Sequence, residues 1–217
     1  MVITFIGLSG CGKSYLSERL TEERDFKSIC CDDIIEKKLK AHLEQGEYSN
    51  IDGVAKWMGH PYEKDFEQHQ KLYLDKENEV MQEVLDTLGD DGWGLNQDFV
   101  VDTTGSVIYL GEEVLKGLKQ RSRIIYLGIP DSELEFMFNQ YLKEPKPVIW
   151  NDVFSPEKGE SNEEALKRCY PELIKQRTEM YYKYADVTLI IDRKNSCLLY
   201  TSPSPRDRTR SRMPSSA

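Results

Sequence analysis

Short apolar runs alternate with amphipathic segments along most of the chain. Five runs have the length of buried strands, and they cover residues 2–6, 26–31, 99–101, 124–127 and 186–191. Between them, apolar residues recur every three to four positions and predict helices over residues 13–21, 34–43, 50–57, 67–88, 111–119, 131–142 and 163–184. Strands that alternate with helices in this way form right-handed crossovers. The pattern therefore predicts an α/β fold with a parallel sheet covered by helices on both faces.

One long segment, residues 143–161, does not follow this pattern. It is polar, contains three prolines and has no strong periodicity. A segment of this kind is typical of a mobile lid over a binding site rather than of packed structure. We therefore interpret residues 143–161 as a lid within a single domain that covers residues 1–194.

A glycine-rich motif, GLSGCGKS, joins the first predicted strand to the first predicted helix. Its glycines let successive backbone N–H groups converge on one point, and the following helix directs the positive end of its dipole there. Lys13 is expected to reach the β- and γ-phosphates of a nucleotide, and the Ser14 hydroxyl to ligate Mg²⁺. ATP and Mg²⁺ are therefore the predicted cofactors. The residues expected to contact the nucleotide are Gly7, Gly10, Cys11, Gly12, Lys13, Ser14 and Tyr15.

Carboxylates end two further predicted strands. Asp32 and Asp33 follow the second strand, and Asp102 closes the third. Because the carboxyl ends of parallel strands meet at one edge of a sheet, these side chains are expected beside the glycine-rich loop. A short apolar strand closed by Asp holds Mg²⁺ or its water shell in many P-loop proteins, so Ser14 and Asp102 are the predicted metal ligands.

The composition favours a small-molecule partner. The chain has 217 residues, of which 39% are hydrophobic, and this is enough for the core of one domain. A net charge of −9 disfavours a general nucleic-acid surface. Neither a signal peptide nor a membrane-spanning segment is evident, and the five cysteines lack metal-ligand spacing. We expect a cytoplasmic monomer with reduced thiols that binds neither nucleic acid nor membranes.

The character of the chain changes beyond residue 195. Residues 201–205 read Thr-Ser-Pro-Ser-Pro, and four arginines follow before the end. A basic arm for RNA or a membrane is one interpretation of this stretch. It offers no face to a core, however, and it looks like translated adapter or vector sequence. We therefore predict that residues 195–217 form a disordered, non-native tail.

Five motifs in order resemble shikimate kinase and the wider nucleoside-monophosphate-kinase group of P-loop proteins. They are GLSGCGKS, CCDDIIEKKL, DTTGSV, KPVIW and RTEMYYKYADVTL, spread over about residues 1–194. The resemblance implies a three-layer P-loop kinase fold whose five-stranded parallel sheet has the order 2-3-1-4-5. It also implies ATP- and Mg²⁺-dependent phosphoryl transfer to a hydroxyl group of a small metabolite.

The resemblance assigns roles to individual residues. Asp32 matches the aspartate that holds the acceptor hydroxyl, and Arg177 matches a substrate-binding arginine. Lys146 stands where the family has a lid arginine that stabilises the transferring phosphoryl group. Arg193 falls near an arginine that packs against adenine. The implied catalytic residues are thus Lys13, Asp32 and Lys146. For Arg177 a surface salt bridge is the alternative, and for Lys146 a solvated position in the lid.

The acceptor side departs from the family pattern. Leu74 stands where the family has an acceptor-binding arginine, and Cys30 replaces an aspartate. Thr103, Thr104 and Gly105 replace a glycine triplet, and we expect them to contact a different substrate. The donor half of the site is intact, whereas the acceptor half is rebuilt. A nucleotide-binding regulatory protein without kinase activity is therefore the alternative function. A GTPase or a motor ATPase fits less well, because the guanine motif N-K-x-D is absent from the sequence.

Overall fold

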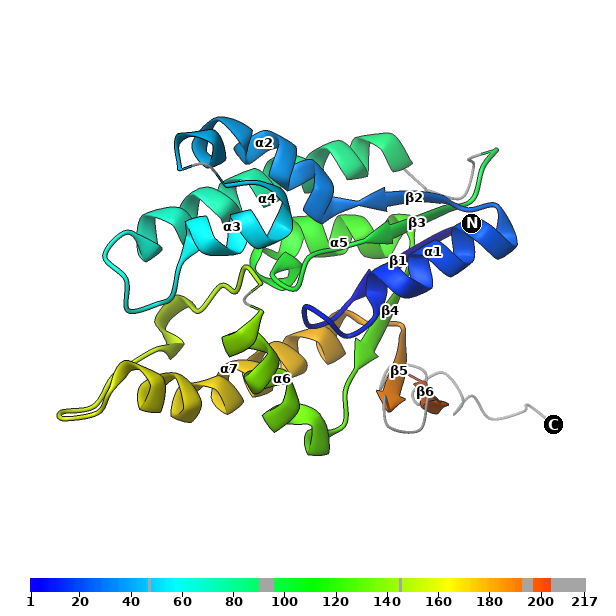
Figure 1. Cartoon of the computed structure of the whole chain (residues 1–217). Helices are drawn as coiled ribbons and strands as arrows, with labels where there is room; N and C mark the ends of the chain where they lie inside the picture. Colours follow the sequence, from blue (N-terminus) through cyan, green and yellow to red (C-terminus); the bar gives the residue numbers. More distant parts are fainter. Residues whose placement is uncertain (47, 90–95, 145, 193–196, 204–217) are drawn as a thin grey trace.

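A central sheet organises the computed structural model, which describes residues 1–46, 48–89, 96–144, 146–192 and 197–203. Within these residues the sheet has six strands in the order β2-β3-β1-β4-β5-β6 (Figure 1). Their bounds are β1 Val2–Ile6, β2 Lys27–Cys30, β3 Phe99–Asp102, β4 Arg123–Gly128, β5 Val187–Asp192 and β6 Cys197–Pro203. Strands β1 to β5 pair in parallel. The predicted α/β fold and its strand order 2-3-1-4-5 are confirmed.

Helices cover both faces of the sheet. Helix α1 lies across one face, and α4 and α5 lie behind the other (Figure 1). The α-helices are α1 Lys13–Arg24, α2 Cys31–Gln45, α3 Asn50–Met58, α4 Phe66–Leu88, α5 Glu112–Arg121, α6 Leu134–Lys143 and α7 Asn162–Tyr184. Short 3-10 turns are η1 Val107–Tyr109, η2 Asp131–Glu133 and η3 Asn151–Val153. These helices make the three layers that the motif order implies.

The hydrophobic core combines residues of the sheet with residues of the surrounding helices, including the long helix α4. The central strand β1 buries Phe5 and Ile6, and α4 buries Val80 and Val84, which are four residues apart and therefore on one helix face. Strands β1 and β3 pair with each other, and their carboxyl ends carry the candidate site. Among the described helices, none is long and apolar enough to cross a membrane.

Helix α2 begins three residues earlier than the sequence predicts. Cys30 ends β2 in an extended conformation, and the helix starts at Cys31. Asp32 and Asp33 therefore lie in the first helical turn instead of in a connecting loop. Carboxylates are favourable there, because the helix dipole places partial positive charge at its N-terminus.

The first half of the predicted lid is partly packed into the protein, because it contains two core residues. Ile149 is buried and Trp150 has an exposed fraction of 0%. The Trp150 ring centre lies 6.0 Å from that of Tyr141 and 6.2 Å from that of Tyr170. The prediction that residues 143–161 form no packed structure is wrong here. Two large apolar residues are too few to produce a periodic pattern, so no helix or strand could be predicted around them.

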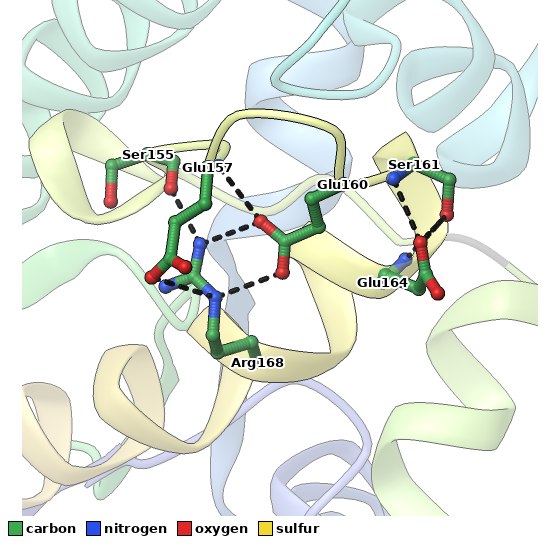
Figure 2. A network of polar contacts seen from close by, with 6 residues as sticks. All are labelled: Ser155, Glu157, Glu160, Ser161, Glu164 and Arg168. Atoms are coloured by element: carbon green, nitrogen blue, oxygen red, sulfur yellow. Dashed lines mark hydrogen bonds and ion pairs between the residues drawn. The ribbon is translucent and has the colours of Figure 1, made fainter.

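The second half of the predicted lid is fixed to the start of α7 by polar contacts (Figure 2). The Arg168 guanidinium donates from Nε to Glu160 Oε1 at 2.9 Å and from Nη2 to the Ser155 carbonyl at 2.7 Å. Ser161 and Glu164 form a capping box, in which each side chain bonds the other residue's backbone N–H. The chain is therefore held on both sides of the loop that precedes α7.

Strand β6 lies within the segment predicted to be disordered. It pairs antiparallel with β5, with Leu189 opposite Thr201. The prediction of disorder is therefore wrong for residues 197–203. Residues 195, 196 and 204–217 lie outside the described residues, and the non-native origin of the tail stays a prediction.

Candidate functional site

The glycine-rich loop crosses the carboxyl end of the sheet between β1 and α1. Gly7, Gly10 and Gly12 have φ values of 148°, 77° and 102°, in the region that favours glycine. A Cβ on Gly7 would lie 2.5 Å from the Leu127 carbonyl oxygen of β4. Only glycine fits this close approach. The loop therefore has the backbone shape that lets successive N–H groups face one ligand.

Lys13 is folded back across this loop. Its side chain is 6% exposed, and its Nζ donates to the carbonyl oxygens of Gly7 at 3.1 Å and Leu8 at 3.0 Å. The ammonium group is thus held at the N-terminal end of α1. Its charge and the positive end of the helix dipole both favour an anion at this place. Cys11 is buried beneath the loop and contributes its backbone to the turn.

Asp102 has the geometry expected of a metal-side carboxylate. It is 3% exposed, the Ser14 hydroxyl donates to it, and its Oδ1 has no hydrogen-bond partner. Burial raises the pKa of Asp102, while Lys13 and the Ser14 bond lower it. A buried carboxylate oxygen without a partner is costly unless a cation or water satisfies it. Ser14 and Asp102 therefore fit the predicted Mg²⁺.

Any metal here would also need ligands from the nucleotide. In the part of the chain that the structure describes, no three His, Cys, Asp or Glu side chains converge on one point. Magnesium keeps several waters and binds through one or two protein groups plus substrate phosphates in sites of this kind. The Ser14 and Asp102 pair matches that arrangement.

Asp32 lies at the same edge of the sheet. Its Oδ1 accepts a hydrogen bond from the Tyr73 hydroxyl at 3.4 Å. Burial raises the pKa of Asp32, the Lys13 charge lowers it, and the charge of Asp102 raises it. Cys30 of β2 pairs with Asp102 of β3, so Asp32, two residues after Cys30, lies at the same edge of the sheet as Asp102.

The turn after β3 uses its hydroxyl groups inside the protein. Thr103 donates to the Phe5 carbonyl at 2.7 Å, and Thr104 donates to a carboxylate oxygen of Glu77. Ser106 donates to the other oxygen of Glu77 at 2.6 Å. The sequence assigns Thr103 and Thr104 to the acceptor, but in the structure both side chains are buried and have protein partners.

Sequence reasoning missed Glu77. It has an exposed fraction of 0%, and burial raises its pKa to about 7 against the effect of the two hydroxyl bonds. The signal in the sequence was its spacing. Glu77 lies four residues after Tyr73 and four before Met81, on the buried face of α4. An acid in the middle of such a face needs polar partners, which are the hydroxyls of the turn after β3.

Arg177 connects this turn to the lid. Its side chain is 3% exposed, its Nη2 donates to the Ile149 carbonyl at 2.6 Å, and its Nη1 lies 3.5 Å from the Gly105 carbonyl. Gly105 also accepts from the Tyr181 hydroxyl. The Arg177 Nε is buried without a hydrogen-bond partner. The alternative of a surface salt bridge for Arg177 is therefore wrong.

A cavity of about 350 Å³ lies in front of the first half of the loop. Ser9 and Gly10 form one wall, and α6 and α7 form others through Tyr141, Tyr170 and Arg177. Lys146 also lines the cavity, and its Nζ pairs with Asp52 Oδ1 of α3 at 2.5 Å. The cationic side chains of Lys146 and Arg177 thus line the same cavity as Ser9 and Gly10 of the loop. Its volume is typical of a small-molecule site.

Two predicted nucleotide contacts are not brought into this space. Tyr15 is 59% exposed, and its hydroxyl accepts a hydrogen bond from Arg19 on the surface of α1. Arg193, assigned to adenine, lies outside the described residues. The residues that the structure does gather are those of the loop with Asp32 and Asp102, and those of the cavity with Lys146 and Arg177.

Comparison with known proteins agrees with this architecture. No family model matches the chain. A shikimate kinase from Dictyoglomus turgidum is 23% identical over 194 residues, which cover 89% of each sequence. The crystallised shikimate kinase from Acinetobacter baumannii in complex with shikimate aligns with a TM-score of 0.55 at 20% identity, over 97% of this chain and 89% of that one. The chain has the fold of the shikimate kinases.

A second solved structure supports the same conclusion. The shikimate kinase from Bacteroides thetaiotaomicron aligns with a TM-score of 0.55 at 14% identity, over 89% of this chain and 90% of that one. These alignments confirm the resemblance that the five motifs suggest. Each alignment covers 89% or more of both chains.

Proposed function

We propose that the protein is a P-loop kinase that transfers the γ-phosphoryl group of ATP to a hydroxyl of a small molecule. Similarity to shikimate kinase supports phosphoryl transfer to a small molecule in general. The observation that carries the proposal is the unpartnered, buried Asp102 Oδ1 beside Ser14 in a complete phosphate loop. This arrangement is suited to a nucleotide with its metal.

The donor half acts through the loop. Lys13 exchanges its two carbonyl partners for the β- and γ-phosphates, and the backbone N–H groups of the loop bind the same oxygens. Ser14 and Asp102 would hold Mg²⁺, and the ion would supply positive charge to offset the negative charge that develops during transfer.

The acceptor half depends on Asp32. Its carboxylate is oriented by Tyr73 and lies close enough to Lys13 for their charges to interact. From there it orients the acceptor hydroxyl and takes its proton as the oxygen attacks phosphorus. Lys146 and Arg177 line the cavity beside the loop and stabilise the negative charge on the transferred group.

The acceptor is less acidic than shikimate. Leu74 is partly buried against the core, and the resemblance to shikimate kinase places it where that family has an acceptor-binding arginine. The Thr103 and Thr104 hydroxyls are already bonded within the protein. A small carboxylate would therefore lack one of its charged partners, so a neutral or weakly acidic polyol fits this half of the site better.

A screen of the full chain against hydroxylated metabolites, with ADP release as the readout, tests the function. One acceptor should raise ADP release well above the rate of ATP hydrolysis by water, and Lys13→Ala should abolish the increase. The second candidate is a nucleotide-binding regulatory protein. It is favoured by the Thr103 and Thr104 hydroxyls, which are bonded within the protein. Tight ATP binding with no turnover on any acceptor would support that candidate instead.

A further inference from the structure

Three side chains on one face of α4 each hold a different part of the site. Gln70, Tyr73 and Glu77 are spaced three and four residues apart and therefore share a helix face. Tyr73 bonds Asp32, and Glu77 bonds the turn after β3. Gln70 bonds the lid, since its Oε1 accepts from the backbone N–H of Trp150 at 2.8 Å and of Asn151 at 2.9 Å. The proposed mechanism gives Gln70 no role so far.

The backbone that Gln70 holds is in an unusual conformation. Asn151 has a φ of 47°, in the left-handed region that residues other than glycine adopt at an energetic cost. Such a conformation persists only where the surroundings fix it. Here the fully buried Trp150 ring donates through Nε1 to the Tyr141 hydroxyl at 3.2 Å, and Gln70 accepts from two successive N–H groups.

This turn determines where the two cavity cations lie. The residue before Trp150 is Ile149, whose carbonyl accepts the 2.6 Å hydrogen bond from Arg177. Lys146, three residues further back, lines the cavity and pairs with Asp52. If the chain at Trp150 and Asn151 moved, the Ile149 carbonyl would leave Arg177 and the backbone of Lys146 would shift with it.

We propose that Gln70 is a positioning residue for phosphoryl transfer. It fixes the inner end of the lid, and through that segment it places Lys146 and Arg177 against the γ-phosphate of ATP. The proposal rests on the proposed function, in which the loop binds a nucleoside triphosphate. ADP has no γ-phosphate, so its affinity depends on the loop and not on these two cations.

The experiment compares MgATP and MgADP binding by titration calorimetry in the full chain. Gln70→Leu keeps the size of the side chain and removes the acceptor oxygen, and it should weaken ATP binding by roughly tenfold, as expected for a lost charge-assisted contact, while ADP affinity stays within about twofold. Gln70→Glu keeps an oxygen that accepts both N–H groups, and it should restore the parent ratio of the two affinities. Gln68→Leu is the matched control, because Gln68 is an exposed residue of the same helix.

Hydrogen exchange of the peptide that covers residues 148–154 provides a second readout. Gln70→Leu should speed exchange of the Trp150 and Asn151 amides, and Gln68→Leu should not. A smaller folded fraction lowers the calorimetric stoichiometry but leaves the ratio of affinities unchanged, so partial unfolding cannot imitate the result. Gln70→Met replaces Gln70→Leu if the leucine variant does not fold.

The outcomes separate this proposal from the proposed function. If the parent protein binds neither ATP nor ADP, the proposed function fails. If the parent binds both and Gln70→Leu weakens them equally, or changes neither, Gln70 does not position the cavity cations and the proposal is overturned.

Discussion

Replacing Glu77 with glutamine tests how the buried carboxyl under the turn after β3 is charged. Glu77 is fully buried, accepts from the Thr104 and Ser106 hydroxyls, and has its pKa raised by burial to about 7 from an ordinary value of 4.5. Glutamine has nearly the same shape and carries no charge at any pH. Its amide oxygen and NH₂ group can serve the same two hydroxyls.

The size of the effect follows from the change in pKa. At about 1.4 kcal/mol per unit, a rise from 4.5 to about 7 corresponds to roughly 3 kcal/mol. Between these two values the native protein keeps a proton that the unfolded chain releases. The contribution of Glu77 to the free energy of unfolding is therefore complete below pH 4.5, decreases as the pH rises, and is lost above about pH 7.

Urea unfolding followed by tryptophan fluorescence at a series of pH values measures this effect. From pH 5 to pH 8, the stability of the parent relative to Glu77→Gln should fall by roughly 2–3 kcal/mol. Glu79→Gln is the control, because Glu79 is an exposed residue of α4 paired with Lys76. The difference in free energy of unfolding between the parent and Glu79→Gln should not change in this way from pH 5 to pH 8.

A constant difference between the parent and Glu77→Gln from pH 5 to pH 8 would refute the reasoning. It would mean that Glu77 is ionised throughout this range. The hydrogen bonds from Ser106 and Thr104, together with the smaller effect of the Arg177 charge, lower the pKa of Glu77 and would then outweigh the cost of burying the carboxylate.

Three further predictions concern ligands. Lys13→Ala should remove most ATP affinity in calorimetry while circular dichroism shows an intact fold, because the bonds of Lys13 within the described residues go to loop carbonyls; unchanged affinity would contradict the phosphate assignment. Asp102→Asn should weaken nucleotide binding in Mg²⁺ but not in EDTA, and an equal loss in both would exclude a metal role for Asp102. Shikimate should be a poor substrate in steady-state assays, since losing one arginine partner at Leu74 costs roughly tenfold to a hundredfold in affinity; a submillimolar KM would show that another cation replaces it.

The shape of the glycine-rich loop could be predicted from sequence because its determinants are local. Eight consecutive residues, Gly7 to Ser14, fix the loop, and its three positive φ values belong to glycines that the motif already contains. Asp32 and Asp102 followed from topology, because the ends of parallel strands share one edge of the sheet. Neither step required knowledge of distant contacts.

The parts that were missed depend on contacts between distant residues. Thr104 and Glu77 are 27 positions apart, and Gln70 and Asn151 are 81 apart. A helical period reveals that Gln70 and Glu77 share a face, but it does not reveal what packs against that face. The same limit explains Trp150, whose burial depends on rings from α6 and α7.

The shared face of α4 also bears on how proteins with this fold diversify. The phosphate loop lies in the segment from β1 to α1, whereas the supports of Asp32, the turn after β3 and the lid lie within eight residues of another helix, residues 70–77. Substitutions at Tyr73 or Glu77 change the support of Asp32 or of the turn after β3, and they leave the residues of the phosphate loop unchanged. A lineage with the proposed function can therefore change its acceptor through Tyr73 and Glu77, whereas a change at Gln70 also lowers its affinity for ATP.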